Sequence, residues 1–326
     1  MASTITKALK RINPFAKPKR RRERQSTEMT RVYNPNDPAD FPVFGVATTE
    51  VCNLSCVMCH FNGPGVKKRK RTLSVEQVEK FMKQIPKGRQ LWFSGTGDFF
   101  MDPHALEHVR LAHAHGHKPC ILTHGQLFSP EVLDSLLENG VRFIRMSVDA
   151  IDAETYKNIR LGGKFERILE ACAYLRKKKE KYPDLRVEIN NTILKPNDDL
   201  IQQYCDFWRG KVDGINFNAE YYDTFHFRNT FRPIPEKRND CELSVYVLPS
   251  GRMAPCCATM VVQHEKDQEW MPHIDETSPK EAFQKFQQMY KDPESPLRKI
   301  CAQCGWWILW AYDEKGETPY WKHVEL

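Results

Sequence analysis

The sequence has no apolar run approaching the roughly 20 residues of a membrane-spanning helix, and no secretory signal is visible. We therefore expect neither a transmembrane nor an exported protein. Without an export signal, the eleven cysteines indicate metal ligation rather than disulfides, because the cytoplasm keeps thiols reduced. The 326 residues, 40% of them hydrophobic, are enough for one large cytoplasmic domain and a small one.

The body of the chain also lacks excess positive charge, although the formal net charge is +7. Residues 7–24 carry nine Lys or Arg against Glu23 alone, so the remainder is close to neutral. This argues against a basic nucleic-acid-binding surface on the body and confines the charge to a leader, which we expect to be solvated and flexible. The alternative is that residues 7–24 contact an anionic membrane, RNA or an acidic protein.

Three cysteines stand close together in residues 49–62, where Cys52, Cys56 and Cys59 have the spacing C-x3-C-x2-C. Three thiolates on a short loop can hold three irons of a [4Fe–4S] cluster and leave the fourth iron open to a small molecule. A zinc site is one alternative, but it favours C-x2-C pairs and a fourth ligand at set spacing, for which the adjacent His60 is poorly placed. A disulfide is the other, and it would leave one thiol unpaired.

An alternation of strands and helices begins after residue 40. It predicts a parallel sheet with right-handed crossovers, whose chemistry lies at the C-terminal ends of the strands. The cysteine loop follows the first strand and so falls at that edge. The predicted strands are 44–48, 90–94, 119–123, 143–148, 186–193 and 214–217, and the helices begin near 74, 103, 130, 164 and 198.

The cysteine spacing after a first strand resembles the radical S-adenosylmethionine (SAM) enzymes. The resemblance implies an α/β fold, a partial (β/α)6 TIM-like barrel, in which the open iron binds the amino and carboxylate groups of SAM. In that family an electron from the cluster splits SAM to methionine and a 5′-deoxyadenosyl radical, which abstracts a substrate hydrogen. The electron comes from a flavodoxin- or ferredoxin-type donor. The residue before the third cysteine is commonly aromatic and stacks near adenine; here it is Met58, and Phe61 is the alternative.

The turn after the second strand contains Gly95, Thr96, Gly97 and Asp98. Glycines at a strand end let the backbone approach a ligand, and the carbonyls there can accept from an ammonium group. This turn resembles the Gly-rich motif that holds the SAM amino group in the family. The family usually has Glu-Pro where this chain has Asp98-Phe99. This chain therefore has an acidic residue at the first position but no proline at the second.

Polar residues follow the third and fourth strands as well. His124 stands in Thr-His-Gly, which is similar to the family's frequent Thr-Asn-Gly. The resemblance implies that Ser147 contacts the ribose or carboxylate of SAM and that Arg160 binds the carboxylate. Asp149 is a further candidate SAM contact, with capping of a turn as the alternative.

A second cysteine group follows the sixth strand, where Cys241, Cys256 and Cys257 precede Cys301 and Cys304. Four thiolates can make a closed site, and zinc and [4Fe–4S] both fit one. The arrangement resembles the SPASM extension of radical SAM enzymes, or its shorter form, twitch. No cysteine follows Cys304, which favours twitch. The resemblance implies an auxiliary [4Fe–4S] cluster on Cys241, Cys256, Cys301 and Cys304, with Cys257 as an alternative ligand.

The predicted organisation is therefore a leader (1–40), a radical SAM partial barrel (41–220), and an auxiliary-cluster domain with an aromatic tail (221–326). A hairpin signal spans 244–257, with Pro-Ser-Gly-Arg at its turn. We expect the aromatic tail to form a core seam under the auxiliary cluster.

The resemblance implies oxidation or epimerisation, at a carbon bearing a hydroxyl or amine, of a small polar metabolite such as a sugar or an aminocyclitol. An epimerase also needs a hydrogen donor, for which Cys257 and Cys205 are the candidate thiols. Residues at the ends of the fifth and sixth strands are candidates for the substrate pocket: Asn190, Asn191, Asn218, Glu220, Tyr221 and Tyr222.

Three other functions stay open at this point. Peptide modification is the main rival, although a leader of 40 residues has no room for a recognition domain of about 80 residues. A radical SAM enzyme that acts on tRNA or lipid would use the leader as a docking arm. A non-catalytic, zinc-stabilised nucleic-acid-binding protein would hold zinc at both cysteine groups and cleave no SAM.

Overall fold

The computed structural model describes residues 37, 39–193, 198–219, 243–260, 268–303 and 321–326. The predictions for the leader, for Glu220 to Tyr222, for Cys241 and Cys304, and for most of the aromatic tail lie outside these residues. No helix in the described part is long and apolar enough to cross a membrane.

The described strands form one sheet with the order β8-β7-β1-β2-β3-β4-β5-β6-β9. Strands β1 to β6 run parallel in sequence order, as predicted. Strand β7 extends this parallel sheet beyond β1, whereas β8 and β9 are antiparallel to their neighbours. The bounds are β1 Val43–Val46, β2 Gln90–Phe93, β3 Lys118–Thr123, β4 Phe143–Ser147, β5 Arg186–Ile193, β6 Gly214–Ala219, β7 Val245–Val247, β8 Met253–Ala254 and β9 Trp321–Glu325.

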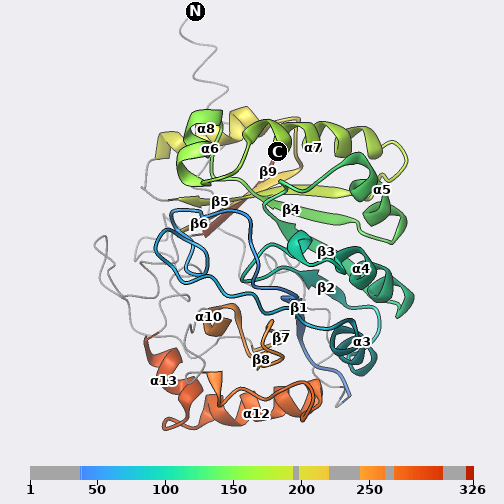
Figure 1. Cartoon of the computed structure of the whole chain (residues 1–326), viewed down its shortest axis with the longest axis vertical. Helices are drawn as coiled ribbons and strands as arrows, with labels where there is room; N and C mark the ends of the chain where they lie inside the picture. The colour runs from blue at the N-terminus through green and yellow to red at the C-terminus, as the bar shows by residue number, and fades with distance from the viewer. Residues whose placement is uncertain (1–36, 38, 194–197, 220–242, 261–267, 304–320) are drawn as a thin grey trace, which may run out of the picture.

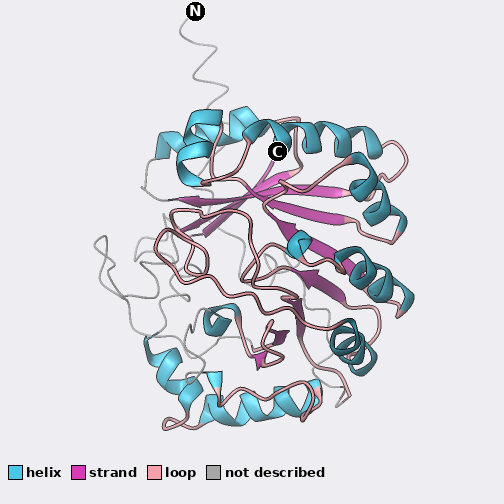
Figure 2. Ribbon diagram, in the orientation of Figure 1, coloured by secondary structure: helices cyan, strands magenta, loops and turns pink. Residues whose placement is uncertain are grey.

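Helices cover the outer side of the curved sheet (Figures 1 and 2). Several begin at the cap that their sequence specifies: Ser74 and Gln77 form a capping box at α3, and Ser129 caps α5 just before a proline. The helices are α3 Val75–Gln84, α4 Ala105–Ala114, α5 Pro130–Glu138, α6 Ala153–Ile159, α7 Phe165–Lys178, α8 Asp198–Trp208, α10 Cys257–Met260, α12 Pro279–Lys291 and α13 Pro296–Gln303, with a 3-10 turn η1 at Phe99–Met101.

The sequence therefore predicted the α/β fold and the parallel strands correctly, and missed three features. The first is the short helix α6, which Asp152 caps. The second is that the predicted hairpin, β7–β8, continues the main sheet through pairing of β7 with β1. The third is β9, which comes from the end of the chain and pairs with β6.

The two faces of the sheet bury different side chains, because side chains alternate along each strand. Residues such as Ile121 and Ile144 face the helices in the large outer core. The inner face lines the lumen of the curved sheet, and Trp92, Cys120 and Phe143 pack there as an apolar floor. The rings of Trp92 and Phe143 meet edge to face, with their centroids 4.9 Å apart.

A buried ion pair lies next to this apolar floor. Arg145 donates from Nε and Nη2 to Glu188 Oε2 at 3.0 and 2.6 Å, and Asn216 Nδ2 donates to the same oxygen at 3.1 Å. The Arg145 guanidinium also lies 5.3 Å from the Trp92 ring centroid. Glu188 Oε1 also accepts from Arg186 Nε at 2.5 Å, and Arg186 in turn binds Glu325, so two arginines and two glutamates balance each other at this level.

Removing one member of this pair leaves a buried charge without its partner. We expect Glu188→Ala to lower the free energy of unfolding by about 3–5 kcal/mol. The measurement is denaturation by urea, with Arg145→Met/Glu188→Met as control. The double variant leaves no lone buried charge, because Arg186, the other partner of Glu188, keeps Glu325, and it should therefore lose less stability. A loss for Glu188→Ala smaller than that of the double variant would contradict this account.

Candidate active site

The cysteine loop is closed at its base by contacts between its two ends. Leu73 N donates to Thr48 O at 2.8 Å, and Thr49 pairs with Thr72 as an isolated bridge. The carboxylate of Glu50 is buried and binds the Arg71 guanidinium through both oxygens, at 2.9 and 2.7 Å. A charge-assisted contact of this kind fixes the geometry of two side chains at once. The loop is therefore anchored where it leaves β1 and where it returns.

The middle of the loop pairs with the segment after α6. Ser55 N donates to Leu161 O at 3.0 Å, and Val57 N donates to Ile159 O at 2.9 Å. Gly162 follows with a φ of 94°, and a Cβ at this position would lie 3.4 Å from Asn53 O. The positive φ favours glycine, whereas the contact itself would leave room for a Cβ. These contacts hold the cysteine loop, the blue segment after β1, over the sheet (Figure 1).

The three thiols each accept an N–H hydrogen bond. Leu54 N donates to Cys52 Sγ at 3.5 Å, and Asn62 N donates to Cys59 Sγ at 3.2 Å. The Arg160 guanidinium donates to Cys56 Sγ at 3.7 Å. Donors aimed at sulfur stabilise thiolates and tune iron–sulfur clusters. The local geometry thus suits three anionic ligands.

Burial opposes ionisation of the same thiols. It raises the pKa of Cys52 to about 12 and is the main cause that raises the pKa of Cys56, which nearby Arg160 partly opposes. Such thiols become thiolates when a metal replaces the proton. In the described part of the chain, no three side chains of the usual metal-binding types gather around a single ion. As thiolates, the three cysteines could hold three irons of a [4Fe–4S] cluster.

The Gly-rich turn after β2 lies directly against the cysteine loop. Gly97 N donates to Thr49 O at 3.1 Å, and Asp98 N donates to Val51 O at 2.9 Å. A Cβ on Gly97 would lie 2.2 Å from Val51 O, so only glycine permits this approach. The sequence predicted glycines that admit a ligand; the structure shows that Gly97 also admits the cysteine loop.

Asp98 joins the turn to the end of β3. Its Oδ2 accepts from Thr123 Oγ1 at 2.6 Å and from His124 N at 2.9 Å, while Oδ1 accepts from Phe100 N at 3.0 Å and caps η1. The carboxylate is buried among these donors. Asp98 therefore organises the site, and the predicted contact with SAM falls more naturally to main-chain carbonyls of the turn.

His124 connects β3 to the cysteine loop. Its Nδ1 accepts from Gln126 N at 3.1 Å, which leaves the proton on Nε2 to donate to Asn53 Oδ1 at 2.8 Å. Burial lowers the pKa of His124 below its ordinary value, so the ring is neutral near pH 7. The predicted site residue is thus in place, as a neutral link between two loops.

Asp149 and Arg160, which are both predicted SAM contacts, bind each other. Arg160 Nε donates to Asp149 Oδ2 at 2.8 Å, and Thr192 N donates to Oδ1 at 2.5 Å. Asp149 is buried and has a φ of 62°, a conformation that Asp tolerates better than most residues. Its carboxylate is occupied by internal donors, and it holds the Arg160 guanidinium against Cys56.

Two buried polar atoms at this site have no partner in the described part of the chain. They are Asn62 Oδ1 and Thr96 Oγ1. Asn62 Nδ2 donates to Thr96 O at 3.0 Å, so both residues lie where the cysteine loop meets the Gly-rich turn. Buried polar groups normally find partners. A polar ligand such as the amino-acid end of SAM would supply them.

The remaining predicted residues fall in different places. Ser147 ends β4 on the lumen face, and Met58 and Phe61 are half-buried in the cysteine loop. Cys205 was predicted as a hydrogen donor, but it is buried in the outer core between α8 and the sheet, away from the lumen, and does not suit that role. Cys257 begins α10, and its side chain is outside the described part.

Sequence reasoning missed three residues that the structure brings into the site: Asn53, Asn62 and Thr123. Asn53 follows Cys52 directly, and Asn62 lies three residues after Cys59. Their amide groups, so close to the cysteines, could have indicated a role in the site. Their roles depend on contacts with the turns after β2 and β3, which no spacing in the sequence reveals.

Comparison with known proteins bears on these features directly. The family model described as the radical SAM superfamily matches residues 46–207, which contain the cysteine loop and the turns around it. Residues 46–207 form a radical SAM domain. The radical SAM part of the predicted resemblance is therefore confirmed.

Two curated relatives match this domain. The AdoMet-dependent heme synthase of Methanosarcina barkeri is 29% identical over 151 residues, which are 46% of this chain and 42% of that protein. The GTP 3′,8-cyclase of Chlorobaculum tepidum is 28% identical over 169 residues, which are 50% of this chain and 49% of that protein. The chain thus spans less than half the length of these relatives.

Among solved structures, SuiB of Streptococcus suis bound to its precursor peptide SuiA is similar to this chain. The match has a TM-score of 0.54 and 14% identity, and it covers 80% of this chain and 68% of that one. At this identity the likeness shows the fold alone. It supports the predicted TIM-like arrangement around the radical SAM site.

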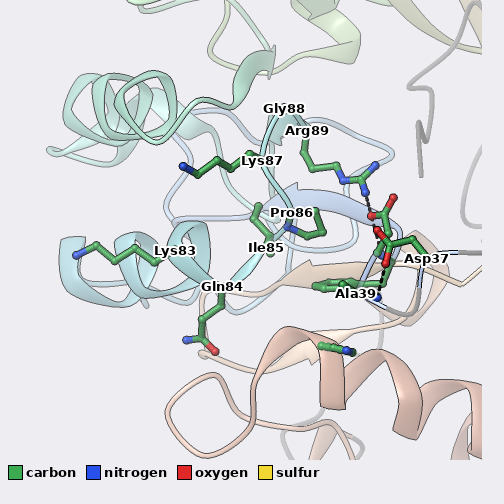
Figure 3. Close-up of a pocket in the computed structure, with 12 residues that line it drawn as sticks. Asp37, Ala39, Lys83, Gln84, Ile85, Pro86, Lys87, Gly88 and Arg89 are labelled. Atoms are coloured by element: carbon green, nitrogen blue, oxygen red, sulfur yellow. Dashed lines mark hydrogen bonds and ion pairs between the residues drawn. The ribbon is translucent and has the colours of Figure 1, made fainter. Parts of the chain in front are cut away.

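A depression of about 550 Å³ lies at the opposite, N-terminal edge of the sheet (Figure 3). It is lined by Asp37 and residues 39–41, by residues 83–89 before β2 and by Lys280 of α12, and Arg89 forms an ion pair with Asp40. None of the predicted site residues lies in it. We therefore assign the chemistry to the cysteine-loop edge of the sheet.

A side chain at Gly97 should push the Gly-rich turn and the cysteine loop apart. We expect Gly97→Ala to weaken SAM binding by about tenfold or more, because displacements of about 1 Å are costly at a preorganised site. The measurement is equilibrium SAM binding to anaerobically reconstituted protein. Gly65→Asn is the control, because a Cβ there meets nothing within 4 Å and Asn tolerates the positive φ of 79° at this position. Equal affinities in the two variants would contradict the role of Gly97.

Proposed function

We propose that the chain is a radical SAM enzyme that oxidises or epimerises a small polar metabolite at a carbon bearing a hydroxyl or an amine. The observation that carries this proposal is the three-thiol loop, held over the ends of parallel strands beside a lumen lined with polar groups. With Cys52, Cys56 and Cys59 as ligands, a [4Fe–4S] cluster would supply reductive cleavage of SAM and, through the resulting radical, abstraction of a substrate hydrogen.

The residues around the thiols would bind and orient SAM. Carbonyls of the turn from Gly95 to Gly97 can accept from the SAM ammonium group. Asn62 and Thr96 offer further polar atoms at the same place. Ser147 is available for the ribose or the carboxylate. Arg160 keeps N–H donors beyond those bound to Asp149, and a contact with the SAM carboxylate through them remains our proposal.

The lumen supports a small polar substrate. Side chains at alternate positions of β5 share one face, so Asn190 lies on the same side as Glu188, with Asn216 bonded to that glutamate. Because Arg145 and Glu188 cancel each other's charge, the groups left to a substrate are amides and hydroxyls. Such groups suit the hydroxyls and amines of a sugar or an aminocyclitol better than a highly charged molecule.

Asn191 lies on the other side of the strand, so it leaves the set of candidate substrate-pocket residues. It is buried and hydrogen-bonds with Tyr204 of α8, in the layer between helices and sheet. Asn190 and Asn191 are thus neighbours in sequence with opposite surroundings, and they make a matched pair for a test.

The second candidate is modification of a peptide. The solved structure of SuiB holds a precursor peptide. Because the two proteins share a fold, a peptide is a second candidate substrate for this chain. A peptide would have to reach the same lumen, and its backbone amides would use the same neutral hydrogen-bonding groups. The choice between the two rests on which compound gives up a hydrogen.

We also propose an auxiliary [4Fe–4S] cluster in a twitch-like extension. Cys256 follows β8 and Cys301 lies on α13, and neither forms a disulfide. Their predicted partners, Cys241 and Cys304, belong to the part of the chain that is not described. The hairpin β7–β8, predicted from its turn sequence, places Cys256 directly after β8 and so supports the proposal. An auxiliary cluster would offer a route for the second electron of an oxidation.

The test of the proposed function is transfer of deuterium into 5′-deoxyadenosine from sugars and aminocyclitols labelled at carbons bearing hydroxyl or amine, and from labelled peptides. We expect transfer from a small polar compound, lost by about tenfold or more in Asn190→Ala, while SAM cleavage without substrate continues. Asn191→Ala should retain the transfer per folded protein. Transfer from peptides only, or greater loss in Asn191→Ala, would contradict this proposal.

A further inference from the structure

A buried pair of hydroxyl groups joins the Gly-rich turn to a strand from a later part of the chain. Ser94 is the first residue after β2 and leads into the turn, and its Oγ lies 2.8 Å from Tyr246 Oη, within hydrogen-bond distance. Tyr246 is the central residue of β7. Both side chains are buried, with 5% of Ser94 and 1% of Tyr246 exposed. A bond of this kind is costly to break, because each buried group then lacks a partner.

The tyrosine side chain reaches the turn across an intervening strand. The sheet order β7-β1-β2 places β1 between Tyr246 and Ser94 (Figure 1). The Tyr246 ring belongs to one buried cluster with Ala47, and its centroid lies 5.2 Å from that of the Phe44 ring. Ala47 also borders the turn, since a Cβ on Gly95 would lie 3.1 Å from the Ala47 Cβ. The ring and the hydroxyl of Tyr246 therefore both support the Gly-rich turn.

The Gly-rich turn is held mainly at its two ends. At one end Ser94 N donates to Val46 O at 3.2 Å, and at the other Gly97 N donates to the cysteine loop. Within the described residues, no hydrogen bond involves Gly95. The Gly95 carbonyl is therefore available to a ligand, and its direction depends on how firmly the two ends are fixed. The Tyr246 hydroxyl is the side-chain contact that fixes the first end.

We propose that Tyr246 is a positioning residue for SAM, whose hydroxyl holds Ser94 and so fixes the direction of the turn carbonyls that accept from the SAM ammonium group. The inference rests on the proposed function, in which this turn binds SAM. It gives the hairpin β7–β8 a role in supporting the SAM site that is independent of any cluster on Cys256. Tyr246 acts through Ser94 and does not itself contact SAM.

Loss of the hydroxyl should loosen the turn and leave the chemical step unchanged. A turn that samples several conformations binds SAM more weakly, because only the competent fraction of molecules binds it. Once SAM is bound the carbonyls are in place, so the rate at saturating SAM should equal that of the wild type. A hydrogen bond of ordinary strength corresponds to about a three- to tenfold change in affinity. The signature of a positioning residue here is therefore a raised KM at unchanged kcat.

The test uses Tyr246→Phe, which keeps the ring and its contact with Phe44, and Ser94→Ala, which removes the same bond from the other side. In each variant we expect Kd for SAM, and KM for SAM in dithionite-driven formation of 5′-deoxyadenosine, to rise about three- to tenfold. The double variant should lose no more affinity than either single one, because all three lack the same bond. The matched control is Tyr174→Phe, which removes a hydroxyl that donates to Asp134 Oδ2 at 2.9 Å on the outer helix α7. It should bind SAM as the wild type does.

Amide hydrogen exchange tests the same contact without SAM. In the reconstituted protein before SAM is added, the amide of Gly97 should exchange faster in Tyr246→Phe and Ser94→Ala than in the wild type, because the turn opens more often. The exchange of this amide in Tyr174→Phe should be unchanged.

Two sets of results would overturn the role of Tyr246. One is SAM affinity and Gly97 exchange in Tyr246→Phe equal to those of the wild type, or equal changes in Tyr174→Phe. The other is a fall in kcat at unchanged KM, or additive losses in the double variant, which would mean that Ser94 and Tyr246 act separately. A wild type that binds SAM yet accepts no hydrogen from any small polar compound would contradict the proposed function alone, and the affinities and exchange rates would still decide the role of Tyr246.

Discussion

The main-chain hydrogen bonds of the cysteine loop are the interaction on which the rest of this structure depends. The loop bonds to the turn after β2 through Thr49 and Val51, and to the segment after α6 through Ser55 and Val57. Backbone contacts of this kind fix position without using the thiols, which stay available for metal. Glycine at 97 permits the contact, since a Cβ there would lie 2.2 Å from Val51 O, and glycine at 162 permits the positive φ of the facing segment.

Side chains then convert this scaffold into a rigid site. Asp98 ties two strand ends together, His124 adds the cysteine loop, and the Asp149–Arg160 pair brings a cation to Cys56. Each of these groups is satisfied internally, so their geometry is set before any ligand arrives. Such preorganisation is what a reaction through reactive intermediates requires. It also explains why the unsatisfied atoms of Asn62 and Thr96 stand out.

The sequence predicted much of the fold, because the periodicity and caps of this chain agree with the structure it adopts. Ser74 and Gln77 marked α3, and the run from Arg186 to Ile193 marked β5. The position of the cysteine loop followed from parallel topology alone. The sequence did not reveal that β7 pairs with β1, or that the chain end adds β9, since strand pairing between distant segments leaves no local signal.

The sequence likewise predicted some features of the candidate site and not others. Residue types and spacing located the thiols and the Gly-rich turn, but they did not reveal that Asp149 and Arg160, both predicted SAM contacts, bind each other. A carboxylate and a guanidinium suit both roles equally well, and only their distance distinguishes the two. Likewise, Asn190 and Asn191 had the same predicted role, and only the strand pairing shows that they lie on opposite faces of the sheet.

The central claim is that Cys52, Cys56 and Cys59 hold a [4Fe–4S] cluster. The most direct measurement is iron and sulfide content after anaerobic reconstitution, for the wild type and for Cys52→Ala/Cys56→Ala/Cys59→Ala. The account predicts about eight irons per chain in the wild type and about four in the variant, the remainder belonging to the auxiliary cluster. Zinc in place of iron, or an iron content that the three substitutions leave unchanged, would contradict it.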